Sequence, residues 1–87
     1  QQLASSGVLS YEEKKKEQRE ERARKRKLQQ LEGEIAELEE QMVMYEQQLS
    51  DPDIAMDYEK LMEINQDLEQ VRAELEALYE EWGALID

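Results

Sequence analysis

Hydrophobic residues recur every three or four positions in two long stretches of the chain. The members are Leu28, Leu31, Ile35, Leu38, Met42, Tyr45 and Leu49 in the first, and Leu61, Ile64, Leu68, Val71, Leu75, Leu78, Trp82 and Leu85 in the second. Steps that alternate between three and four place these residues on one narrow stripe of a helix, the a and d seam of a coiled coil. The pattern therefore predicts coiled-coil helices at about residues 28–50 and 57–85.

The segment between the two seams has the features of a turn. Pro52 cannot donate the backbone hydrogen bond that a continuing helix needs, and it disfavours helix at the preceding residue. Asp51 is a candidate cap for a short turn that begins with Pro52, and Asp57 is a candidate cap for the second helix. We therefore expect a turn at residues 51–56.

Two seams of similar length joined by a short turn predict an all-α fold, an antiparallel two-helix coiled-coil hairpin. A turn centred near Asp53 places Leu38 opposite Leu68 and Ile35 opposite Val71. A register one heptad away is the alternative, which the short loop disfavours. In a two-helix hairpin each seam side chain is covered only by the facing helix, so we expect its burial to be partial.

Large side chains and charges flank the seam. Arg72 is expected to meet Glu32 or Glu39 across it. We expect four aromatic residues to pack along the seam with their polar tips in water, and base stacking is the weaker alternative because all four lie in the acidic part of the chain. These are Tyr45, Tyr58, Tyr79 and Trp82.

The first residues lack the heptad pattern. Residues 1–10 are small and polar and are expected to form a flexible linker. Ser10 and Glu13 have the spacing of a capping box, which predicts that a helix begins here. Residues 11–27 would then be a helical extension that leads into the hairpin at residues 28–87.

The net charge of the chain changes sign at the boundary between residues 11–27 and residues 28–87. The net charge is −12, which by itself argues against nucleic acid as a partner. Residues 11–27, however, carry a net charge of +4 and residues 28–87 a net charge of −16. The candidate nucleic-acid-binding residues are the nine cations Lys14, Lys15, Lys16, Arg19, Arg22, Arg24, Lys25, Arg26 and Lys27.

Four of these cations fall on one helical face. Lys15, Arg19, Arg22 and Arg26 are spaced by four, three and four residues, and the heptad frame places them away from the seam. Such a stripe is what contact with phosphate requires. The alternatives are that Glu12–Lys16, Glu20–Arg24 and Glu21–Lys25 pairs only stabilise an exposed helix, or that the stripe contacts a protein or an anionic lipid surface. A basic leucine zipper fits less well, because Pro52 ends the first seam after three heptads.

Composition excludes most other functions. The chain has no His and no Cys, and we find no nucleotide-binding or calcium-loop motif, so we expect no catalytic, cofactor or metal site. A two-helix hairpin also offers no pocket that would give two carboxylates unlike environments. The longest uncharged run is too short for a membrane span. Because the chain begins with Gln, we expect it to be a piece of a longer protein.

The layout resembles the C-terminal domain of ABC-F family ATPases, the Uup-like soluble proteins of bacteria. The resemblance covers roughly residues 10–86. It lies in SYEEKKKEQR at residues 10–19, RARKRK at 22–27, LEGEIAELE at 31–39, the turn LSDPD at 49–53, the restart DYEKL at 57–61 and the close LYEEW at 78–82. The turn with its restart, combined with the close, is the more specific part.

The resemblance implies a cytoplasmic parent protein with two ATP-binding cassettes and no membrane domain. ATP and Mg²⁺ would bind there and not in this segment. The resemblance further implies action on the ribosome and a coiled coil that binds ribosomal RNA or DNA; the fragment itself is expected to be a monomer. Two alternatives stay open: a structural coiled coil for protein–protein interaction or self-association, and an acidic arm that docks a basic ribosomal protein.

Overall fold

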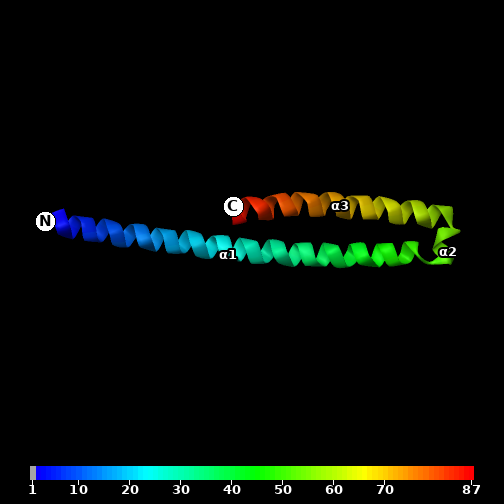
Figure 1. The fold of residues 1–87 in the computed structure, drawn as a ribbon, viewed down its shortest axis with the longest axis horizontal. Coiled ribbons are helices and arrows are strands. Elements are labelled where there is room, and N and C mark those ends of the chain that lie inside the picture. The colour runs from blue at the N-terminus through cyan, green and yellow to red at the C-terminus, as the bar shows by residue number, and fades with distance from the viewer. Residues whose placement is uncertain (1) are drawn as a thin grey trace.

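The chain forms a long rod of two antiparallel helices joined by a single helical turn (Figure 1). The computed structural model describes the backbone of residues 2–87 and the side chains of residues 7, 8 and 10–87. Helix α1 spans Gln2–Leu49, α2 spans Pro52–Ala55 and α3 spans Tyr58–Ile86. The rod measures 81 × 15 × 14 Å. The all-α fold with two long packed helices is therefore confirmed.

The connection between the long helices is held by two aspartate caps. The Asp51 carboxylate accepts a hydrogen bond from the backbone N–H of Asp53 at 3.0 Å, and Pro52 lies in the first turn of α2. The Asp57 carboxylate accepts from the backbone N–H of Lys60 at 3.2 Å at the start of α3. Each cap satisfies a backbone donor that a helix start leaves without a partner. Both predicted caps are confirmed.

The side chains at the centre of the seam are more deeply buried than we expected for a core made of only two helices. Six seam residues are buried, with exposed fractions from 1% to 9%: Leu31, Ile35, Ile64, Leu68, Val71 and Leu75. The remaining seam side chains, among them Leu38 and Leu78, are half-buried. Long side chains that lie beside a seam can cover its flanks. The expectation of partial burial is thus wrong for the centre of the seam.

The predicted register is wrong by about one heptad. Leu38 shares a shallow groove with Glu74 and Leu78, not with Leu68. Ile35 likewise shares a groove with Tyr79 and Trp82. The prediction assumed a symmetric turn around Asp53, but α2 forms an extra helical turn there, and α3 begins beyond the end of α1 (Figure 1). The alternative register is therefore the observed one.

Helix α1 begins earlier than the sequence predicts. It starts at Gln2, so Ser10 lies inside a helix and does not begin one. Residues 2–10 contain no Pro and only Gly7 as a residue of poor helix propensity, so nothing stops the helix at this point. The expected linker at residues 1–10 is therefore wrong for the backbone of residues 2–10, and residue 1 lies outside the described residues.

The N-terminal part of α1 has no helix beside it. Figure 1 shows that α3 ends about halfway along α1, so that the N-terminal half of α1 projects from the rod. The residues from 10 to 23 whose side chains lie on this part are all exposed. No helix among residues 2–87 is both long enough and apolar enough to cross a lipid bilayer.

Candidate nucleic-acid interface

The basic residues of the predicted interface lie on the projecting part of α1 and at its junction with the hairpin. Helix α1 runs without a break through residues 11–27. Seven of the nine predicted residues are exposed and have no carboxylate within ion-pair distance among the described residues: Lys14, Lys15, Lys16, Arg19, Arg22, Lys25 and Arg26. The Lys15 ammonium lies 5.9 Å from the ring centre of Tyr11, one helical turn earlier.

The cationic stripe consists of Lys15, Arg19, Arg22 and Arg26. Because α1 is helical throughout this stretch, the spacing of four, three and four residues places their Cβ atoms on one face. At about 1.5 Å per residue the stripe is about 16 Å long. Double-stranded DNA rises about 3.4 Å per base pair along its axis, so a stripe laid along the duplex axis spans about five base pairs.

The two other predicted residues bind the end of α3. We call this place the open end, where residues 81–86 of α3 lie beside residues 24–28 of α1. Arg24 Nη1 donates a hydrogen bond to the backbone carbonyl of Leu85 at 3.0 Å. Lys27 Nζ lies 3.4 Å from Glu81 Oε1. The open end therefore already engages Arg24 and Lys27 in the free domain.

Arg24 also binds a carboxylate of its own helix. Its Nη2 atom lies 2.7 Å from Glu21 Oε1, and its Nε atom lies 3.2 Å from the other oxygen, Oε2. This bidentate pair lowers the pKa of Glu21 and raises the pKa of Arg24 through the same hydrogen bonds. The last carbonyls of a helix carry partial negative charge, so a guanidinium at the end of α3 is well placed.

Sequence reasoning missed this use of Arg24. The heptad frame extended back from Leu28 places Arg24 at the next seam position, which was the signal available. Arg24 therefore adds one polar contact to the seam, one step before Leu28, the first apolar residue of the seam. The predicted pairs Glu12–Lys16, Glu20–Arg24 and Glu21–Lys25 are not among the ion pairs of the described residues, where Glu21 pairs with Arg24 instead.

The flanks of the hairpin carry polar contacts that the sequence did not predict. The Tyr79 hydroxyl donates to Glu39 Oε1 at 2.9 Å, and Trp82 Nε1 donates to Glu32 Oε1 at 3.2 Å. The bond to Glu39 raises the pKa of Tyr79, because the carboxylate favours the protonated phenol. Both carboxylates expected to meet Arg72 thus accept hydrogen bonds from aromatic side chains.

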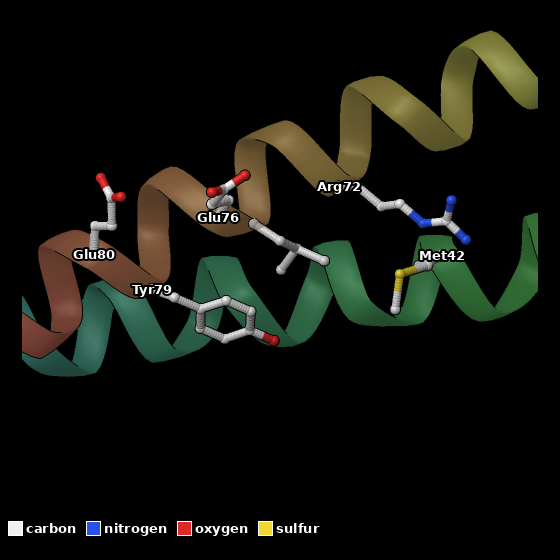
Figure 2. A pocket seen from close by; sticks show the side chains of 6 residues that line it. Met42, Arg72, Glu76, Tyr79 and Glu80 are labelled. Atoms are coloured by element: carbon white, nitrogen blue, oxygen red, sulfur yellow. The ribbon is translucent and has the colours of Figure 1, made fainter.

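Arg72 instead lies along an open groove on one flank. Figure 2 shows its guanidinium beside the thioether of Met42, with the Tyr79 ring lying across α1. Glu76 and Glu80 line the same groove and point away from α1 (Figure 2). No carboxylate of the described residues forms an ion pair with Arg72. The expected pairing of Arg72 with Glu32 or Glu39 is therefore wrong.

Two of the four aromatic side chains pack as the sequence predicts. Tyr45 and Trp82 are half-buried against the core. Tyr79 is 46% exposed and reaches its carboxylate partner across the flank, whereas Tyr58 is 72% exposed at the start of α3. Packing along the seam is thus wrong for Tyr58.

The carboxylates of the hairpin do not gather into a site. Among the residues that the structure describes, no group of three or more acidic side chains is placed to hold a metal ion. Three hollows along the rod are open grooves between α1 and α3, lined by glutamates and seam residues, and another lies on α1 alone beside Lys14 and Glu21. Each of these hollows is open to solvent.

Comparison with known proteins places these features in a family. The family model described as the ABC transporter C-terminal domain matches residues 8–86 of the chain. The match covers the end of the projecting helix, the whole basic stretch and both seams. No curated protein and no solved structure matches the chain significantly.

Proposed function

The chain belongs to the family of ABC transporter C-terminal domains, and from this premise we propose that it is the non-catalytic coiled-coil domain of an ABC-F type ATP-binding protein. We propose that it binds nucleic acid, either ribosomal RNA or DNA, through the basic stretch of α1. ATP and Mg²⁺ would be bound by the cassettes of the parent protein, which would act in the cytoplasm, with the ribosome as a candidate partner.

One observation carries the nucleic-acid proposal. Seven cations without an ion-pair partner among the described residues lie on α1; five of them are on the part that projects beyond α3 (Figure 1), and Lys25 and Arg26 lie at its junction with the hairpin. Four of them form the cationic stripe, which is long enough to follow a phosphate backbone. Lysine and arginine on such a stripe release condensed counterions from the nucleic acid, which favours binding without selecting a sequence.

The hairpin is expected to stay away from the nucleic acid. Residues 28–87 carry a net charge of −16, and like charges repel a phosphate backbone. The projecting helix would therefore contact the nucleic acid, and the hairpin would point outward as an arm. Self-association through the seam is disfavoured, because six seam residues are already buried within one chain. We accordingly propose that the isolated domain is a monomer.

A salt titration tests the proposal. The 87-residue domain is mixed with short fluorescent RNA and DNA duplexes, and anisotropy gives the binding constant at several salt concentrations. The test variant replaces Arg19, Arg22 and Arg26 by Gln. Each phosphate contact contributes about 0.9 to the slope of log K against log salt for B-DNA, so the variant should lose roughly 2.7 units of slope.

The matched control replaces Lys60 and Arg72, the two basic residues of the hairpin, by Gln. If the stripe contacts phosphate, this control keeps the slope of the parent, although it also removes positive charge. Equal losses in both variants would mean that only overall charge matters. An unchanged slope in the stripe variant would contradict the proposal and favour a structural role for the basic helix.

A further inference from the structure

Three exposed apolar side chains lie within seven residues of sequence at the end of the rod that carries the turn. Met56 is 87% exposed, Tyr58 is 72% exposed and Met62 is 45% exposed. Tyr58 and Met62 are four residues apart on α3 and therefore share a helical face, and Met56 lies two residues before Tyr58. We call these three residues the tip patch.

The fold does not need the tip patch. All three side chains lie outside the heptad seam, and none belongs to the core cluster around Ile35, Val71 and Leu75. Helix α2 contains no buried residue and is held by the Asp51 cap. The apolar surface of the tip patch is thus presented to solvent on a capped, ordered turn. Exposed apolar clusters rimmed by polar residues are typical of interaction sites.

The charge around the tip patch indicates what could bind there. Residues 46–63 contain six acidic residues and one basic residue, a net charge of −5. This acidic rim includes Asp53, Glu59 and Glu63, all exposed. A nucleic acid or an anionic membrane would be repelled by it, and so would the equally acidic tip of a second copy. A positively charged partner with an apolar face complements both features.

We propose that the tip patch binds a basic amphipathic segment of a protein partner. The apolar side of that segment would cover Met56, Tyr58 and Met62, and its lysines or arginines would lie against the acidic rim. Unbranched methionine side chains adapt to differently shaped apolar surfaces, and all four methionines of the chain lie between residues 42 and 62. Tyrosine is a common anchor in protein interfaces.

The tip patch is independent of the proposed nucleic-acid interface. Arg26 and the end of α1 at Leu49 are 23 residues apart, which is about 35 Å along a helix. The Debye length at physiological salt is about 8 Å, so charges at one end are screened from the other. The domain can therefore hold two partners of opposite charge at once, and failure of either proposal leaves the other intact.

The test uses a fluorescent Leu/Lys amphipathic helical peptide as the probe and anisotropy as the measurement. The variant M56Q/Y58Q/M62Q is compared with the control V8Q/I86Q, which removes exposed apolar side chains far from the tip. Both variants keep the charge of the parent, so general electrostatic attraction is unchanged. We expect about tenfold weaker binding for the tip variant and unchanged binding for the control. Circular dichroism confirms that each variant keeps its helices.

Further measurements test whether the peptide, a lipid surface or a second copy of the chain occupies the tip patch. Hydroxyl-radical footprinting should show protection of Met56 by the peptide. Equal affinity of the tip variant and the parent, or protection only outside residues 46–63, would overturn the proposal. So would tip-dependent binding to phosphatidylserine vesicles, or a tip-dependent dimer in sedimentation, because a lipid surface or a second copy would then be the occupant. A Leu/Glu peptide of equal length should not bind.

Discussion

The buried centre of the seam should contribute much of the stability of this domain, and substitution of Leu75 by Ala tests this. Leu75 is 4% exposed and belongs to the core cluster with Ile35 and Val71. Replacing a buried Leu by Ala costs about 2–5 kcal/mol in protein cores. A two-helix core can partly collapse onto the space that is left, so we expect a loss at the lower end, about 2–3 kcal/mol.

This loss is large compared with the stability of the whole domain. Folded proteins have about 0.05–0.15 kcal/mol of stability per residue, so a chain of this size is expected to have roughly 4–13 kcal/mol. For a domain of this size, 1 kcal/mol shifts the Tm by about 4–8 °C. The Leu75→Ala variant should therefore melt about 10–20 °C lower. Urea unfolding followed by helical circular dichroism gives the free energy, and an unchanged m value shows that the same transition is measured.

Leu61→Ala is the matched control, because it deletes the same atoms from the same helix. Leu61 is a seam residue, but it is only half-buried near the turn. In the register predicted from sequence it would lie opposite Tyr45 inside the paired section; in the observed register α3 extends beyond α1 there. Leu61→Ala should consequently cost about 1 kcal/mol or less. Equal losses for the two variants would refute the observed distribution of burial along the seam.

Two further predictions concern Gly33 and the Lys27–Glu81 ion pair. Gly33 lies inside α1 with open space where a Cβ would be, so Gly33→Ala should raise the free energy of unfolding by about 0.5–1 kcal/mol; a lower urea midpoint would contradict this. A zero-length carbodiimide reagent should join the Lys27 amine to the Glu81 carboxylate, which lie 3.4 Å apart. In the register one heptad away, Lys27 would meet Glu74, so a Lys27–Glu74 product in mass spectrometry would show that the register is wrong.

The helices were predictable from sequence because their determinants are local. The three–four spacing of the seam follows from the geometry of a helix facing one partner. Pro52, with Asp51 and Asp57 on either side, marks the turn through backbone hydrogen bonding within a few residues. These signals do not depend on where the chain lies in space, and the structure agrees with each of them.

The register was not predictable in the same way. Leu, Ile and Val occupy most seam positions, so sliding one helix by a heptad exchanges one apolar pair for another at little cost. Buried polar residues commonly fix the register of coiled coils, and no buried polar or charged side chain is present among the described residues. The extra helical turn α2 and the flanking contacts, such as Trp82 with Glu32, distinguish the registers. Both depend on three-dimensional geometry.

The position of the basic residues on α1 was predictable from the sequence, and their contacts were not. Charge counting alone placed nine cations in residues 11–27. It could not show that Arg24 and Lys27 are used to hold the end of α3, because their partners are more than 50 residues away in the chain. A backbone carbonyl such as that of Leu85 has no sequence signal at all.

The charge of the whole domain is a poor guide to what its surfaces can bind. At physiological salt an exposed charge acts over about 8 Å, whereas the rod is 81 Å long. A phosphate near Arg19 therefore meets the +4 of residues 11–27, and a partner at the tip meets the −5 of residues 46–63. Arg24 and Lys27 belong to the basic stretch and also bind the end of α3, through the Leu85 carbonyl and the Glu81 carboxylate. A polyanion that draws these two side chains away would compete with the Leu85 carbonyl and the Glu81 carboxylate, so nucleic-acid binding and closure of the open end would oppose each other.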